Sequence, residues 1–314
     1  MLYQCSWALL FFSIFCSFAG EHYNYFVIVP GLNGSGGQNI KSDTLPSAFQ
    51  EDAIDIIPSS FKVRHAGTQH FLPDLGQRRC LNHLAQTMQP LQYNQKNQKI
   101  IMYTVSQGTA TGLTYVSKHP EKVCAIVCES VLASPNSAIW HTMKNSYKSI
   151  ESVPLFYSLM PHLARLCFPF YNPTQQEPLF NTQNISNDTT IILLHATRDK
   201  QIPFLNAGAM YYALRAQGHT NTYLFSVVSN YHHMILNNKE HTKEITAIRY
   251  LLAKAAGQEC ATTDVSLYQP NYLHYKSAYD HLVRKQHQLR KDTRSFFVGC
   301  LLAWFYLTTL TMIC

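Results

Sequence analysis

The sequence is poor in charged residues. Asp, Glu, Lys and Arg make up 14% of its 314 residues, against about 25% in an average soluble protein, and hydrophobic residues make up 46%. This composition excludes an intrinsically disordered chain. The formal net charge is +7, but +4 of it comes from one run that holds Arg284, Lys285, Arg290, Lys291 and Arg294 against Asp292. The small remainder excludes the basic surface of a nucleic-acid-binding protein.

Metal-binding and disulfide patterns are also missing. There is no C-x-x-C motif, and no spacing of His and Cys suits zinc. Of the nine cysteines, two lie in the first 20 residues and two in the last 20. At most two disulfide bridges fit among the other five, and none is required. Cys124 and Cys128 cannot bond to each other on a strand, where about 13 Å would separate them.

Two apolar runs lie at the ends of the chain. Residues 1–20 hold the run from Trp7 to Ala19, whose last residues have the small-x-small pattern of a signal-peptide cleavage site. An uncleaved membrane segment is the alternative. Residues 295–314 hold 19 uncharged residues from Phe296 to Cys314, enough for a helix to cross about 30 Å of hydrocarbon. In a eukaryotic host the same tail can be a glycolipid-anchor signal.

The basic run stands directly before the second apolar run. Residues 257–294, polar at first and then basic, are predicted to be a juxtamembrane linker whose cations contact lipid phosphates. Export of the body would leave these cations on the far side of the membrane, but the positive-inside tendency is weak after a loop of more than about 60 residues. We therefore expect a membrane protein whose body lies on the exported (extracytoplasmic or lumenal) side.

Between the two ends, in residues 21–256, apolar runs alternate with helical patterns. Strands are expected at 25–29, 61–64, 99–105, 122–128, 190–195 and 222–228, and helices at about 74–88, 107–118, 204–217 and 240–254. Strands that are apolar on both faces indicate a mostly parallel sheet with helices on both faces, an α/β fold. The alternation stops in residues 132–188, where aromatic residues and prolines gather. A helical cap insertion is expected there, and a plain small subdomain is the alternative.

Ser106 stands where an expected strand meets an expected helix. A serine on such a tight turn exposes its hydroxyl at the amino end of the helix, where the negative charge of an attacked carbonyl is favoured. The turn needs small residues two positions before and after the serine. Gly108 meets this requirement, whereas Thr104 stands in place of the first glycine. Ser106 is therefore the candidate nucleophile.

These motifs resemble those of the α/β-hydrolase superfamily over roughly residues 21–256. The family's motifs appear as Thr104-Val105-Ser106-Gln107-Gly108, as His119-Pro120-Glu121-Lys122-Val123 after the following helix, and as the early loop Pro30-Gly31-Leu32-Asn33-Gly34, with proline where histidine is usual. The resemblance implies the α/β-hydrolase fold. It also implies an oxyanion hole made by the backbone N–H groups of Leu32 and Gln107.

The resemblance further implies an acid after a later strand. Asp199 lies four residues before Pro203, in a segment that resembles the family's strand-end acid motif. A carboxylate there holds the imidazole of the base in one tautomer. Glu129, at the end of the strand that follows the nucleophile, is the rival acid. A helix-capping aspartate is the structural alternative for Asp199.

The general base is expected between the last strand and the last helix. His232 and His233 both lie there. His233 is favoured because Tyr250-Leu251 follows it at the distance where relatives usually carry an aromatic-leucine pair. His232 remains the rival. The order of Ser106, Asp199 and His233, each at a strand end, is the informative feature.

Together these residues predict a membrane-tethered serine hydrolase that cleaves an ester or thioester through an acyl-enzyme. The reaction needs no metal and no organic cofactor. The aromatic insertion and the tether favour an apolar or acyl-chain substrate, either a small molecule or a lipid. Two alternatives stay open: a catalytically inactive binding or adhesion module, which Thr104 makes thinkable, and an acyltransferase that uses the same triad.

Overall fold

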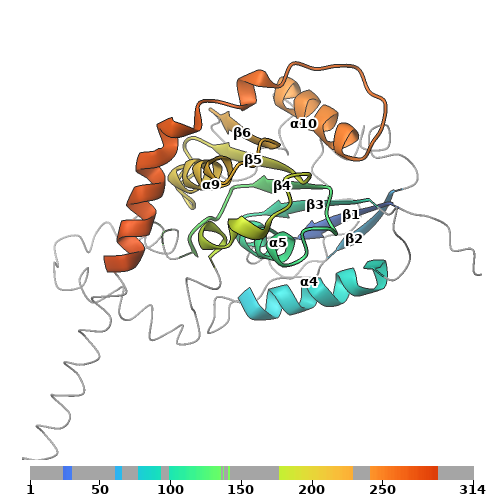
Figure 1. The fold of residues 1–314 in the computed structure, drawn as a ribbon, viewed down its shortest axis with the longest axis horizontal. Coiled ribbons are helices and arrows are strands. Elements are labelled where there is room, and N and C mark those ends of the chain that lie inside the picture. Colours follow the sequence, from blue (N-terminus) through green and yellow to red (C-terminus); the bar gives the residue numbers. More distant parts are fainter. Residues whose placement is uncertain are drawn as a thin grey trace, which may run out of the picture.

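The computed structural model describes residues 24–29, 61–65, 77–92, 99–135, 137, 141, 177–228 and 241–288. Within these ranges six strands form a single parallel sheet in the order β2-β1-β3-β4-β5-β6 (Figure 1). The strands are β1 Asn24–Val29, β2 Phe61–His65, β3 Ile100–Val105, β4 Ala125–Glu129, β5 Thr190–Ala196 and β6 Thr222–Val227. The predicted parallel sheet is therefore confirmed for the described part of the chain.

Helices cover both faces of this sheet. They are α4 Gln77–Gln92, α5 Gln107–Lys118, α9 Leu205–Ala216 and α10 Thr242–Ala255. Alternate residues of β3 enter two separate cores: Met102 packs with residues of α4, α5 and α9, and Tyr103 packs with residues of α10. Because both faces are covered, all six residues of β3 are buried, which explains why the strand is apolar without alternation.

One predicted strand is shorter at its start. The pattern predicts a strand over 122–128, whereas β4 begins at Ala125. The N–H of Lys122 donates to the carbonyl oxygen of His119 at 3.1 Å, so Lys122 belongs to the turn that closes α5. Val123, which lies between this turn and β4, is apolar because it is buried. It does not belong to the strand, which begins at Ala125.

The chain after α10 packs along the domain. The short helical turns η5 Ser266–Tyr268 and η6 Tyr272–Tyr275 are followed by a helical stretch over 276–288. The ring of Tyr268 stacks on Phe225 of β6 with centroids 3.8 Å apart. In Figure 1 this orange-to-red segment passes α9 and continues down one side of the domain. The described part of the predicted linker is therefore in contact with the domain that contains the sheet.

Several predicted segments fall outside the described residues. These are the apolar segments 1–20 and 295–314 and most of the cap insertion 132–188, of which the described part includes η3 Pro178–Phe180 and η4 Thr182–Asn184. Among the described helices, none combines the length and apolar character needed to cross a bilayer. The signal, cap and transmembrane predictions stay predictions.

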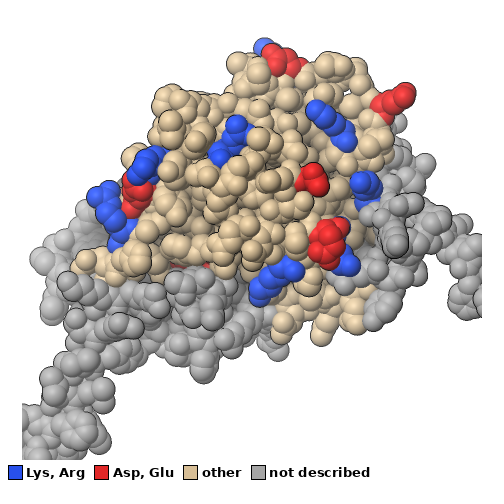
Figure 2. Space-filling model, in the orientation of Figure 1, with Lys and Arg blue, Asp and Glu red and all other residues tan. Residues whose placement is uncertain are grey.

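Charged side chains are dispersed over the surface. On the face drawn in Figure 2, basic and acidic side chains are scattered among uncharged residues, and no broad patch of one sign is visible among the described residues.

Candidate active site

Ser106 occupies a strained turn between β3 and α5. Its backbone angles are φ 54° and ψ −121°, in a region that L-residues other than glycine rarely adopt and that costs on the order of 1–3 kcal/mol. Hydrogen bonds of the Ser106 N–H and carbonyl groups stabilise this strained conformation. The Ser106 N–H donates to the Glu129 carbonyl oxygen at 2.9 Å, and the Ser106 carbonyl oxygen accepts from the Thr109 N–H at 2.9 Å. Ser106 is half-buried in a largely buried surrounding.

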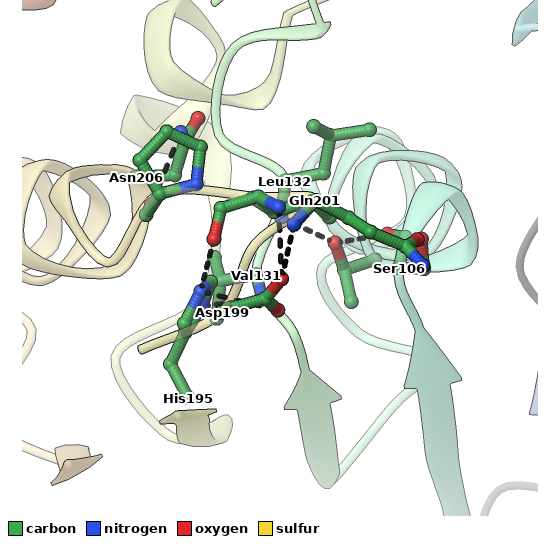
Figure 3. Close-up of polar contacts among 10 residues, drawn as sticks. Ser106, Val131, Leu132, His195, Asp199, Gln201 and Asn206 are labelled. Carbon is green, nitrogen blue, oxygen red and sulfur yellow. Dashed lines mark hydrogen bonds and ion pairs between the residues drawn. The ribbon is translucent and has the colours of Figure 1, made fainter. Parts of the chain in front are cut away.

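Thr109 ties this turn to the chain that leaves β4. Its hydroxyl donates to the Ser106 carbonyl oxygen at 2.6 Å and accepts from the Leu132 N–H at 2.8 Å (Figure 3). The side chain is fully buried, so the hydrogen bond from Leu132 is shielded from water and strengthened by the low local dielectric. The sequence analysis did not single out Thr109. A threonine three residues after the nucleophile carries no signal until its partner near residue 132 is known.

Thr104, which replaces the glycine of the family motif, fits the turn. Its hydroxyl donates to the Val127 carbonyl oxygen at 2.9 Å, and the residue is fully buried. Its methyl group lies against Gly112 of α5, where an added Cβ would be only 2.5 Å away from it. The methyl group of Thr104 therefore faces α5, at a position where α5 carries a glycine.

Gln107 follows Ser106 as the first residue of α5 and is buried. The first N–H groups of a helix have no partner within the helix and point out of its amino end. They are suited to stabilise an oxyanion that forms beside Ser106. Leu32, the other predicted oxyanion donor, lies outside the described residues.

Asp199 lies in a tight turn after β5. One carboxylate oxygen, Oδ1, accepts from the N–H groups of Gln201 at 2.8 Å and Ile202 at 3.0 Å. These two donors fix the orientation of the carboxylate. The side chain is fully buried, and its other oxygen, Oδ2, lies 3.7 Å from Nε2 of His195. Asp199 is therefore a turn-capping residue through one oxygen, while the second oxygen is on the side of His195.

His195, at the end of β5, is a buried structural histidine. Its Nδ1 accepts from the Val131 N–H at 2.9 Å, so this nitrogen carries no proton. Its Nε2 lies 2.9 Å from the Ile202 carbonyl oxygen, which can only accept, so Nε2 carries the proton. These partners assign a neutral Nε2–H tautomer. With both nitrogens engaged, His195 joins the exits of β4 and β5 and is not the general base.

Glu129, the rival acid, accepts a hydrogen bond from a residue of β3. The hydroxyl of Tyr103 donates to Oε2 of Glu129 in a short hydrogen bond, and both residues are buried. Burial, together with the negative charge of Glu129, raises the pKa of Tyr103 well above its usual value. Glu129 pairs with Val105 across the β3–β4 ladder, so its side chain belongs to the sheet face that α10 covers.

The predicted residues that the structure describes meet at one edge of the sheet. Ser106 and Gln107 follow β3 and Asp199 follows β5, with only β4 between them; Figure 3 shows Ser106 and Asp199 on opposite sides of the chain that leaves β4. His232 and His233 lie outside the described residues. Val227, the last residue of β6, pairs with Ala196, so the chain that leads to both histidines leaves the sheet at this same edge.

The described residues offer no metal site at this edge, because no group of three or more His, Cys, Asp or Glu side chains among them could hold an ion. Among the described residues, Cys124, Cys128 and Cys260 are free thiols. A serine hydroxyl, a helix amino end and a buried carboxylate lie at this edge, and these are groups that acyl transfer uses.

The chain is similar to one family model and to several solved structures. The model of the Prolyl oligopeptidase family matches residues 168–259. Among solved structures, a monoacylglycerol lipase of Paleococcus ferrophilus is 13% identical, with a TM-score of 0.45 over 74% of this chain and 94% of that one. An open-form lipase is 11% identical, with a TM-score of 0.47 over 76% and 93%. An esterase of Pyrococcus furiosus is 14% identical, with a TM-score of 0.43 over 74% and 83%. No curated protein matches.

Likenesses at these identities and TM-scores carry no information about the substrate. The matched family model belongs to the same superfamily as the motifs that surround Ser106. The sheet order, the helices on both faces and the strained serine between β3 and α5 agree with it. The matched family model, the sheet order and the strained serine therefore agree with the resemblance to the α/β-hydrolase superfamily that the sequence motifs indicate.

Proposed function

We propose that the protein is a serine hydrolase that cleaves an ester or thioester bond with Ser106 as its nucleophile. The observation that carries this proposal is the backbone of Ser106, which has φ 54° between a buried strand and a helix. Strain of this kind persists only where the surroundings impose it, and it is concentrated at functional sites. Ser106 is the residue directly before α5, and the amino end of a helix favours an oxyanion.

The catalytic cycle follows from the expected partners. His233, or its rival His232, takes the proton of the Ser106 hydroxyl while the serine oxygen attacks the carbonyl carbon. The N–H groups of Leu32 and Gln107 stabilise the tetrahedral oxyanion. The base then protonates the leaving group, and an acyl-enzyme forms. Water, deprotonated by the same base, attacks the acyl-enzyme and releases the acid.

Asp199 supports the base in this proposal. A carboxylate at this strand end stabilises an imidazolium that forms during the reaction. Oδ1 of Asp199 is held by the N–H groups of Gln201 and Ile202, and Oδ2 lies 3.7 Å from Nε2 of His195. We prefer Asp199 as the acid because its segment resembles the family's strand-end acid motif, and Glu129 remains the rival.

The substrate and location are proposed on the sequence. An aromatic-rich insertion over 132–188 suits an apolar or acyl-chain substrate, and the apolar ends suggest a membrane-tethered enzyme on the exported side. The inactive-module alternative drew on Thr104, and the fit of Thr104 against Gly112 removes its main argument. The family-model match to prolyl oligopeptidases favours a second candidate, a peptidase that uses the same nucleophile.

Activity-based labelling tests the proposal. The detergent-solubilised protein is treated with a fluorophosphonate and the modified residue is mapped by mass spectrometry; we expect Ser106. Ser106→Ala should abolish labelling and reduce ester hydrolysis by at least about 10³-fold. Ser130→Ala is the matched control, because Ser130 also has a positive φ, 55°, and follows the neighbouring strand β4. A panel of acyl esters, thioesters and prolyl peptides then separates esterase from peptidase. Labelling elsewhere, or full activity of Ser106→Ala, would refute the assignment.

A further inference from the structure

The segment after α10 is an ordered arm with a defined course. We call residues 266–288 the C-terminal arm. It starts beside the amino end of β6, where the side chain of Gln269 donates from Nε2 to the Thr220 carbonyl oxygen at 2.7 Å. The hydroxyl of Tyr211 in α9 donates to the Pro270 carbonyl oxygen at 2.9 Å. The beginning of the arm is thereby fixed at the edge of the sheet opposite Ser106.

The arm then crosses α9 toward the edge that carries the site. The ring of Tyr275 packs against Phe204, at the start of α9, with centroids 6.4 Å apart. It also covers Gly208, where an added Cβ would lie 2.7 Å from the ring. Phe204 in turn contacts the ring of His195, with centroids 5.9 Å apart. Because α9 begins directly after the Asp199 turn, Tyr275 lies at the carboxyl edge of the sheet.

The helical part of the arm is seated on the domain. Its inward side chains recur every three or four residues, as on one face of a helix: Tyr272, Tyr275, Tyr279, Leu282 and Gln286. Tyr279 packs on Tyr212 with centroids 5.1 Å apart. Leu282 is 2% exposed and Gln286 is 5% exposed. A helix buried along such a stripe has one direction relative to the sheet, unlike a flexible linker.

This direction limits where the apolar tail begins. The arm ends its described course at residue 288, and residue 295 opens the apolar segment. Seven residues span at most about 25 Å even when fully extended. The same interval completes the basic run that starts with Arg284 and Lys285, and cations near a membrane surface are attracted to lipid phosphates. The arm thus leads the tail away from the amino edge of the sheet.

We propose that the C-terminal arm orients the carboxyl edge of the sheet, with Ser106, toward the membrane that holds residues 295–314, and that the substrate is an acyl lipid of that same membrane. The inference rests on the proposed function and specifies its substrate. A rigid arm keeps the site at a short, constant height above the bilayer. The local concentration of membrane-resident substrate is then set by geometry, as for any tethered reaction.

Loosening the arm tests the proposal. The full-length protein is reconstituted in phosphatidylcholine vesicles that contain a fluorogenic oleoyl ester, and hydrolysis is compared with that of the same ester in separate vesicles. A Gly/Ser segment of about twelve residues, which behaves as a flexible coil, is inserted between 288 and 289. The matched control carries the same insertion between Cys260 and Ala261, which are both exposed and precede the arm in the chain. This control leaves the arm and its connection to the apolar tail unchanged.

We expect the unmodified protein and the control to hydrolyse ester in their own vesicles at least about tenfold faster than ester in separate vesicles. The insertion after 288 should remove most of this preference while leaving hydrolysis of soluble p-nitrophenyl butyrate unchanged. Equal preference in all three proteins, or no association with the vesicles, would overturn the inference. If the unmodified protein does not hydrolyse soluble p-nitrophenyl butyrate, the proposed function is refuted instead.

Discussion

Tyr103 and Glu129 form a buried hydrogen-bonded pair near the carboxyl ends of two neighbouring strands. The phenol comes from β3 and the carboxylate from β4, the two strands whose ends flank the Ser106 turn. The Glu129 carbonyl oxygen accepts from the Ser106 N–H at 2.9 Å. One residue therefore supports the Ser106 turn through its backbone and binds a tyrosine through its side chain.

Tyr103→Phe should destabilise the fold by about 1–3 kcal/mol, because it removes a donor from a buried carboxylate. The pH dependence has a definite sign. An unfolded tyrosine ionises near pH 10, and the pKa of Tyr103 in the folded protein is raised well above its usual value. The folded state therefore binds this proton more tightly, and the stability it contributes is present below about pH 10 and lost as the pH rises beyond it.

Urea unfolding between pH 7 and pH 11 measures both effects. The unmodified protein should lose stability above about pH 10, whereas Tyr103→Phe should lose less over the same interval. Tyr223→Phe is a suitable comparison, because the pKa of Tyr223 is also raised, by burial and by the neighbouring Tyr250 rather than by a carboxylate. An identical pH profile for Tyr103→Phe and the unmodified protein would contradict this account.

Exchanging the two carboxylates separately identifies the acid. Asp199→Asn keeps an oxygen that can accept from Gln201 and Ile202, so the turn should persist, while kcat should fall about 10⁴-fold, as when a triad aspartate becomes asparagine. Glu129→Gln keeps an acceptor for Tyr103, and kcat/KM should stay within about threefold. Ester hydrolysis and circular dichroism on both variants check this. The reverse pattern would make Glu129 the acid.

The contact between Thr104 and Gly112 predicts a compensating pair. Gly112→Ala places a methyl group 2.5 Å from Cγ2 of Thr104, and such overpacking costs about 1–3 kcal/mol. Thr104→Ser removes Cγ2 and keeps the hydroxyl that donates to Val127. The double variant should therefore regain most of the stability that Gly112→Ala loses. Thermal unfolding of the four proteins measures the coupling, and strictly additive effects would show that the clash is relieved elsewhere.

The thiols of the sheet should resist alkylation. Burial raises the pKa of Cys124 to about 11 and that of Cys128 to about 12, so thiolate is scarce at pH 8, and thiolate is the reactive form. Cys260 is exposed. Iodoacetamide at pH 8, followed by peptide mapping, should modify Cys260 in the folded protein and reach Cys124 and Cys128 only after unfolding. Rapid alkylation of Cys128 would show that β4 opens in the native state.

Part of this site could be predicted from the local sequence. The strand that ends at Val105, followed by Ser106 and Gly108, predicted the nucleophile turn, because a buried strand that meets a helix at a serine restricts the backbone to few conformations. The order of apolar runs predicted a parallel sheet for a similar reason, since strands covered on both faces show no alternation. These features depend on residues that are neighbours in the chain.

The sequence by itself determined the strands, their covering helices, the serine at the turn and the superfamily that these imply. Only the tertiary structure decided what long-range partners do: that Thr109 joins Ser106 to Leu132, that Thr104 fits because Gly112 faces it, and that His195 is a neutral structural residue. It also turned residues 266–288 from a predicted linker into an arm packed on α9. Each of these depends on contacts between segments far apart in the chain, and hydrophobic periodicity records that a residue is buried but not which residue it meets.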